Sequence, residues 1–525
     1  MVARAGPVTA LRPLGFSAAA LVLVLIGGSV VAVLVRAEGG FSLAPQDWAA
    51  LRFTVLQAAL SALCSVVLAV PVARALARRR FAGRGVLVTL MGAPFILPVI
   101  VAVLGLVMVF GRAGWVSDLL GVFGIAPLNI YGLKGVVLAH VFFNLPLATR
   151  LILQGWLAIP AERFRLAASL GAGPRDIARL LERPMLRAVL PGTVMVIFLI
   201  CTTSFAVALA LGGGPRATTV ELAIYQAFRF DFDLGRAAVL ALLQLALSAV
   251  AAMVALWVAV PSDASGGLDR TVERWDATRT GLRVMDTGLI VLAALFLLLP
   301  LLAIALRGLP QIAALDAAVW AAAWRSLWVA GVSVIVTLAL ALPLALTIAD
   351  LRARPRVARG VEIVVYLAVA TSPLVIGTGL FLLIFPFADP VALALPVTAL
   401  VNGVMALPFA LRAMVPAATE TEARFGRLAA SLGLTGTARL RLLTLPRLRR
   451  SLGFSAALAA ALSLGDLGVI TLFADPGEAT LPLLLYRLMA GYQMDAAAGV
   501  ALLLLALSLG VFWLLDRGGR VDAEV

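Results

Sequence analysis

The sequence has almost none of the residue patterns that bind nucleotides or metal ions. Lys134 is its only lysine and His140 its only histidine among 525 residues. A Gly-x-x-x-x-Gly-Lys-Ser/Thr phosphate loop, a His-Glu-x-x-His pattern and a Cys-x-x-Cys pattern are all absent. We therefore expect a chain that hydrolyses no nucleotide, holds no metal or other cofactor and is not an enzyme.

Charged residues are scarce as well. They make up 13% of the chain, whereas hydrophobic residues make up 62%. No soluble core of this length could bury so much apolar surface, so the composition predicts an all-α polytopic membrane protein. Cys64 and Cys201 both fall inside apolar stretches, and the sequence therefore indicates no disulfide framework.

The hydrophobic runs predict about twelve transmembrane helices, because each is close to the roughly 20 residues that cross a bilayer. We read the first run as a retained span rather than a cleaved signal peptide, because it is long and lacks a convincing cleavage site. The expected spans lie near 15–35, 50–73, 86–110, 133–155, 189–211, 235–260, 286–306, 325–349, 361–385, 391–413, 452–473 and 496–516.

Arginines account for the net charge of +15 and concentrate in alternate loops between these runs. Positive residues favour the cytoplasmic side of a membrane, so both termini are expected in the cytoplasm. No aromatic residues are interleaved with the basic ones, and we expect no nucleic-acid partner. The apolar faces of the spans should instead contact membrane lipid.

A short pattern occurs twice at an offset of 262 residues. Ala167-Ala168-Ser169-Leu170-Gly171 stands thirteen residues before Pro184, and Ala429-Ala430-Ser431-Leu432-Gly433 stands thirteen before Pro446. The duplication predicts two pseudo-symmetric six-helix halves at 1–260 and 286–525, joined by a cytoplasmic linker at 261–285. Each half carries one cytoplasmic loop, at 158–187 and 416–449, for which we expect a short helix, a glycine stop and a second short helix.

These loops resemble the coupling loop of binding-protein-dependent ABC importer permeases, which docks in a groove of the ATPase subunit. The resemblance implies a type I importer fold in a bacterial inner membrane, a homodimeric ATPase that binds ATP and Mg²⁺, and a periplasmic binding protein. Arg165 and Arg427 stand where the family commonly has Glu, and Arg183 replaces a Leu, so the contact chemistry is expected to differ. The matching coupling positions are Ala167, Gly171, Pro184, Ala429, Gly433 and Pro446.

Polar residues inside spans are costly and are candidates for a substrate path. Ser204 and Asp466 correspond at the 262-residue offset. Asp466 has two open interpretations: it attracts a cationic substrate, or it is structural, either capping a helix break made by Gly465 and Gly468 or pairing with an arginine. The other candidates for the path are Thr203, Phe205, Phe473 and Tyr486.

Two further segments, 211–233 and 463–486, are similar to the fused thiamine permeases of Gram-negative bacteria, whose substrates are thiamine and its phosphates. The resemblance covers most of the chain and implies thiamine import. A fused ferric-iron permease is the nearest alternative, and a proton-coupled secondary transporter of twelve spans is a more distant one. The binding protein is expected to dock near 212–234 and 474–495.

Overall fold

The computed structural model describes residues 12–37, 43–92, 96–212, 214, 217–258, 280–351, 354–473 and 476–520. These residues contain no β-strand, and eleven helices among them are long and apolar enough to cross a membrane. The predicted all-α polytopic fold is therefore confirmed, although the described helices do not reach the expected twelve spans.

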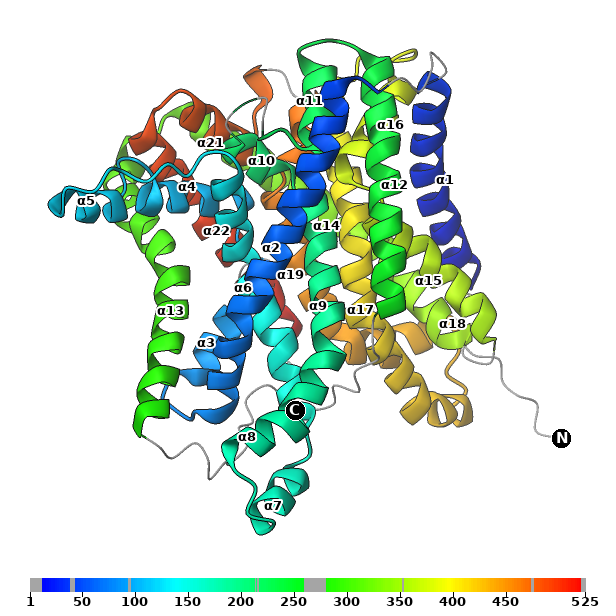
Figure 1. Cartoon of the computed structure of the whole chain (residues 1–525). Coiled ribbons are helices and arrows are strands. Elements are labelled where there is room, and N and C mark those ends of the chain that lie inside the picture. Colours follow the sequence, from blue (N-terminus) through cyan, green and yellow to red (C-terminus); the bar gives the residue numbers. More distant parts are fainter. Residues whose placement is uncertain are drawn as a thin grey trace.

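The helices follow one another in two comparable series (Figure 1). The first series is α1 Arg12–Arg36, α2 Pro45–Arg78, α3 Arg84–Leu90, α4 Val99–Phe110, α5 Trp115–Val122, α6 Leu133–Ala158, α7 Ala161–Ser169, α8 Pro174–Ile177, α9 Arg183–Thr202, α10 Phe205–Leu211, α11 Val220–Arg229 and α12 Leu234–Val258. The second is α13 Thr280–Gly308, α14 Ala317–Asp350, α15 Pro355–Ala370, α16 Pro373–Ile384, α17 Ala394–Ser431, α18 Gly436–Arg439, α19 Leu445–Leu464, α20 Gly468–Phe473, α21 Leu481–Ala490 and α22 Met494–Arg520. The linker predicted at 261–285 lies mostly outside the described residues.

The ninth predicted span, 361–385, is not one helix. It divides into α15 and α16 at Thr371–Ser372, because Pro373 has no backbone N–H and disfavours helical geometry in the residue before it. The Ser372 hydroxyl accepts a hydrogen bond from the Leu374 N–H at 3.1 Å and caps α16. The third predicted span, 86–110, divides in the same way into α3 and α4.

The first helix of each half packs against the other half. α1 contacts α14, α15 and α16, while α13 contacts α2 and α4. In Figure 1 these two helices stand at opposite sides of the bundle. Glycines allow both approaches: a Cβ on Gly105 of α4 would lie 2.7 Å from the Pro300 carbonyl oxygen of α13, and one on Gly379 of α16 would lie closer still to the Ser29 backbone of α1. Neither half is therefore a separately packed bundle.

Ion pairs join the same helices. Arg12 of α1 binds Asp350 of α14, and Arg79, which directly follows α2, donates to Asp286 of α13 at 2.8 Å. Asp286 and Asp350 are almost fully buried, so each carboxylate depends on its arginine for compensation. The first contact therefore attaches α1 to the second half, and the other attaches α13 to the first half.

Candidate coupling loops and translocation path

The two repeated loops have the same backbone geometry. Gly171 and Gly433 both have a φ of +67°, which favours glycine and ends the preceding helix. The Ala172 N–H donates to the Ala167 carbonyl at 2.9 Å, and the Leu434 N–H donates to the Ala429 carbonyl at the same distance. The repeated Ala and Gly positions therefore form one helix-ending motif that is used twice.

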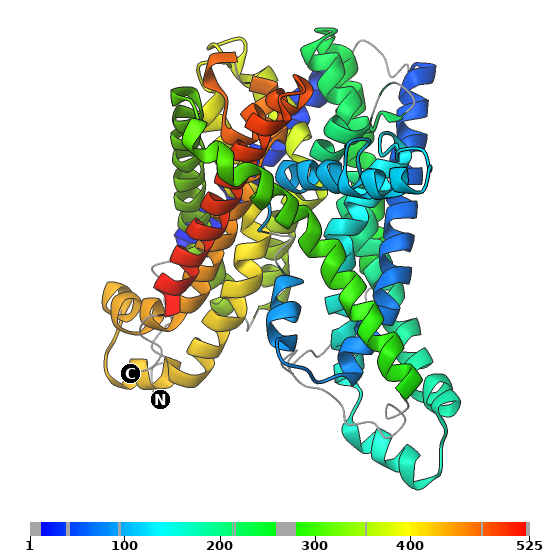
Figure 2. The same ribbon diagram turned by 90° about the vertical axis from the view of Figure 1, so that its left-hand side faces the viewer.

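The loops also share an unusual segment after this turn. A π-helical turn spans Ala178–Glu182 in one loop and Leu440–Thr444 in the other. Pro184 and Pro446 follow in the first turns of α9 and α19, which continue directly from these π-helical turns. Figure 2 shows both loops projecting from the same end of the molecule, at which α22 ends.

One difference separates the loops. The chain breaks at Pro160 between α6 and α7, whereas α17 runs without interruption through the equivalent region to Ser431. At the 262-residue offset Glu422 takes the place of Pro160, and glutamate supplies the backbone N–H that proline lacks. The separate short helix expected in the second loop is therefore a continuation of its span.

Large apolar side chains are exposed on both loops at matching positions. Leu166, Leu170 and Leu180 expose 61%, 76% and 66% of their surface in the first loop. Their counterparts at the 262-residue offset expose 55%, 65% and 69%; these are Leu428, Leu432 and Leu442. Clustered apolar exposure of this kind is typical of surfaces that contact another protein or a membrane.

The fifth and eleventh predicted spans are each broken within the bundle. α9 gives way to α10 at Thr203–Ser204, and α19 gives way to α20 at Gly465–Leu467. Buried glutamines satisfy carbonyls that the first break leaves free, because Gln57 donates to the Cys201 oxygen at 2.8 Å and Gln244 to the Thr202 oxygen at 3.0 Å.

Matching polar clusters lie behind the two breaks. In the first half the Ser61 hydroxyl lies 3.1 Å from His140 Nδ1, and the Asn144 amide contacts the Cys201 sulfur. In the second half the Ser463 hydroxyl lies 2.9 Å from that of Ser333 and accepts from Asn402 at 3.2 Å. His140 and Asn402 correspond at the 262-residue offset, as do Cys201 and Ser463. His140 is thus a member of a buried hydrogen-bonded cluster.

A cavity of about 200 Å³ lies between the breaks. Ser204 lines it together with His140 and Asn144 from the first half, and Ala461 and Gly465 line it from the second. Ser204 is therefore placed where a path between the halves is expected. Thr203 lies next to it, with its hydroxyl directed back to the Ile200 carbonyl at 3.3 Å.

Asp466 has the geometry of a helix cap. Its Oδ1 accepts the Gly468 N–H at 3.1 Å at the start of α20, which matches one of the two interpretations of this residue. Asp466 does not line the central cavity. Phe205 and Phe473 are buried as well, and they pack on Tyr225 and Phe381 with ring centroids 5.4 Å and 5.7 Å apart.

The cap predicts that Asp466→Asn is tolerated and Asp466→Ala is not. Asparagine keeps an oxygen that accepts the Gly468 N–H, whereas alanine removes it at a cost of about 1 kcal/mol. Thermal unfolding of the two purified variants measures this difference. Uptake lost equally in both variants, with Asp466→Asn as stable as the wild type, would favour the charge-based interpretation.

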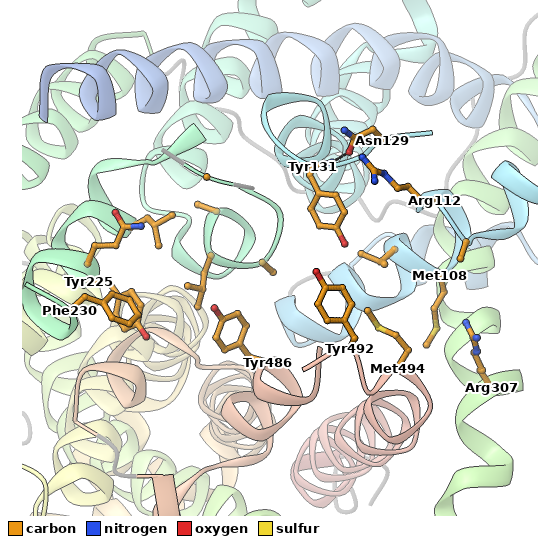
Figure 3. A pocket seen from close by; sticks show the side chains of 18 residues that line it. Met108, Arg112, Asn129, Tyr131, Tyr225, Phe230, Arg307, Tyr486, Tyr492 and Met494 are labelled. Carbon is orange, nitrogen blue, oxygen red and sulfur yellow. Dashed lines mark hydrogen bonds between the residues drawn. The ribbon is translucent and has the colours of Figure 1, made fainter. Parts of the chain in front are cut away.

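A second and larger cavity has a volume of about 930 Å³ (Figure 3). It is lined by residues of α10, α11 and α21, which lie at the opposite end of the molecule from the loops (Figure 1). Tyr486 lines the cavity, together with residues that were not predicted to belong to a site: Arg112, Tyr131, Tyr225, Arg307 and Tyr492. The sequence pattern that could have identified this pair is a repeat with a different offset. Tyr225 and Tyr486 occupy the same position in α11 and α21, but their offset is 261 residues rather than 262.

Two related halves of membrane-crossing helices, a cavity between their breaks and twin loops at one end define a polytopic permease. No family model matches the chain. It is 40% identical to the thiamine transport system permease protein ThiP of Brucella abortus, over 97% of this chain and 96% of that protein. It is 39% identical to the ThiP proteins of Salmonella typhimurium and Escherichia coli, over 96% and 90% of this chain and 96% and 89% of theirs. The chain belongs to the family of thiamine transport system permease proteins, and the predicted resemblance is confirmed.

Proposed function

We propose that the chain is the membrane-spanning permease of an ABC importer that carries thiamine into the cytoplasm. A homodimeric ATPase supplies the energy and holds ATP and Mg²⁺, and a periplasmic binding protein delivers the substrate. The permease itself makes and breaks no covalent bond. Its setting is a bacterial inner membrane, with both termini and the linker at 261–285 on the cytoplasmic side.

The observation that carries this proposal is the matched geometry of the two loops. Each half presents the same glycine turn, the same π-helical turn and three exposed leucines at one end of the molecule. Two equal docking surfaces suit a partner made of two equal subunits, because a two-fold partner offers the same groove twice. Ala167, Gly171 and Pro184 shape one surface, and Ala429, Gly433 and Pro446 shape the other.

The transport cycle follows from this arrangement. Closure of the ATPase dimer on ATP draws the two loops together, and the halves rock so that the path opens outward. The binding protein, docked near 212–234 and 474–495, then releases thiamine toward the central cavity beside Ser204. Hydrolysis of ATP returns the halves to the inward-open state, and the substrate leaves on the cytoplasmic side.

Thiamine is the substrate that the relatives support. All three relatives described above are thiamine permeases, and they align along nearly the whole chain. No observation favours the ferric-iron permease or the proton-coupled transporter over this assignment. The division into halves at 1–260 and 286–525 remains part of the proposal.

Uptake of radiolabelled thiamine tests the proposal directly. Cells that lack the gene are compared with the same cells carrying a plasmid copy, with and without a functional ATPase partner. We expect the plasmid to restore uptake only when the ATPase is active. Uptake that is indifferent to the gene would refute the substrate assignment, and uptake that survives loss of the ATPase would refute the energy source.

A further inference from the structure

The larger cavity gathers most of the tyrosines of the protein. The chain contains five tyrosines, and Tyr131, Tyr225, Tyr486 and Tyr492 all line this one cavity. Two come from each half, so the cavity is built jointly. Tyrosines are rare here and concentrated in one place, which is typical of a recognition surface where flat rings and hydroxyl groups contact a ligand.

Two of its rings, one from each half, are related by the pseudo-symmetry of the fold. Tyr225 is the sixth residue of α11 and Tyr486 the sixth residue of α21, and each helix follows a threonine, Thr219 or Thr480. Tyr225 is held in place by edge contacts with Phe205 and Phe230, at ring-centroid distances of 5.4 Å and 5.7 Å. The fold thus places one aromatic ring from each half on a shared surface.

The charged groups of the cavity are all positive. Arg112 and Arg307 line it, and none of the described lining residues is Asp or Glu. Arg112 has no ion pair with any described residue, and Arg307 has an exposed pair with Asp495 at 3.3 Å, which neutralises it only weakly. In Figure 3 both arginines lie toward one side of the cavity, while Tyr225 and Phe230 lie at the other.

We propose that this cavity is a substrate subsite with two ends, in which Arg112 and Arg307 bind the phosphate groups of phosphorylated thiamine and the tyrosines bind its rings. This inference rests on the proposed function, because thiamine supplies the rings. A guanidinium group makes paired, charge-assisted hydrogen bonds with phosphate oxygens. The ring faces of Tyr225 and Tyr486 attract the positively charged thiazolium ring.

The size and charge of the cavity agree with this ligand. A volume of about 930 Å³ lies within the range of pockets that bind small molecules of this kind. Two arginines would repel unphosphorylated thiamine, which is a cation, but would attract a di- or monophosphate ester. The arginines therefore determine preference among the forms of thiamine, whereas the rings recognise what those forms share.

The test compares two substrates on one transporter. Proteoliposomes containing the permease with its ATPase and binding protein take up radiolabelled thiamine or radiolabelled thiamine diphosphate in separate assays. The double variant R112Q/R307Q removes both cations and keeps side chains that can hydrogen-bond. R52Q is the matched control, because Arg52 is exposed on α2 and does not line the cavity.

We expect R112Q/R307Q to lower the initial rate for thiamine diphosphate by about tenfold or more, since charge-assisted contacts are lost. The rate for thiamine should not fall, because removal of the two cations also removes their repulsion of this cation, and R52Q should change neither rate. In contrast, Y225L/Y486L should slow both substrates alike, because both carry the rings.

Several results would overturn the proposal. Equal losses for both substrates in R112Q/R307Q would assign the arginines to a contact with an acidic partner protein or to folding. Unchanged rates for both would remove them from recognition. A wild-type transporter that carries thiamine but not its diphosphate would refute the phosphate subsite and leave the proposed function intact. One that carries neither would refute the proposed function itself.

Discussion

Thiamine uptake is expected to fall to the level of permease-free cells when Gly171 and Gly433 are both replaced by valine. Both glycines have a φ of +67°, a conformation that costs other residues about 1–2 kcal/mol and that β-branched side chains tolerate least. A Cβ at either position would meet no atom within 4 Å. The effect therefore comes from the backbone turn, which must shift and displace the exposed Leu170 and Leu432.

The controls separate this backbone effect from a loss of protein. Asparagine adopts positive φ more readily than other residues, so the matched variant Gly171→Asn/Gly433→Asn should keep most of the uptake. Each single valine variant should lose about tenfold or more, because one misplaced loop breaks the symmetry of docking. Co-purification of the ATPase and the membrane content of permease are measured in parallel. Wild-type uptake in the double valine variant would contradict the coupling assignment.

Replacement of Glu182 by alanine should lower the stability of the protein far more than replacement of Glu162, a second glutamate in the same loop. Glu182 lies in the first π-helical turn, is 3% exposed, and binds Arg74 of α2 through Oε2 at 2.6 Å and through Oε1 at 3.2 Å. Arg78 is also near, at 3.8 Å. Removal of one partner from a buried ion pair leaves charge without compensation, so we expect a loss of about 3 kcal/mol in the free energy of unfolding.

A second glutamate in the same loop provides the control. Glu162 pairs with Arg165 at 3.0 Å, but both side chains are 75% exposed, and such surface pairs contribute at most about 1 kcal/mol. Thermal unfolding in detergent should therefore show a clear fall in Tm for Glu182→Ala and almost none for Glu162→Ala. Equal Tm values for the two variants would show that Glu182 does not anchor the loop to α2.

Much of this architecture could be predicted from the sequence because it depends on hydrophobic length and on one repeated offset. The apolar runs located most spans, and the 262-residue offset located both loops. Each of these features can be recognised from local composition or from one repeated spacing, without knowledge of contacts between distant segments. The prediction therefore worked where neighbouring residues alone determine the structure.

The remaining features depend on contacts between distant segments. The break before α16 follows from Pro373 and the Ser372 cap, yet the hydrophobic run passes through it without interruption. α17 is continuous because position 422 is a glutamate and not a proline. A comparison that looks for similar residues in the two loops overlooks this difference. The tyrosine cavity was missed because its two halves are in a register of 261 residues, and because Tyr131 and Arg307 reach it from other elements.

The exchange of first helices sets an order of events during synthesis. When α13 is synthesised, α2 and α4 have already been made, so these two packing partners are available at once. α1 has no such advantage, because α14 begins 281 residues after α1 ends (317 − 36). At about 5–20 residues per second this delay lasts roughly 14–56 seconds. During that interval the face of α1 that will pack on the second half must be covered by lipid or by the insertion machinery, so a ribosome stalled before α14 leaves the first half unfinished.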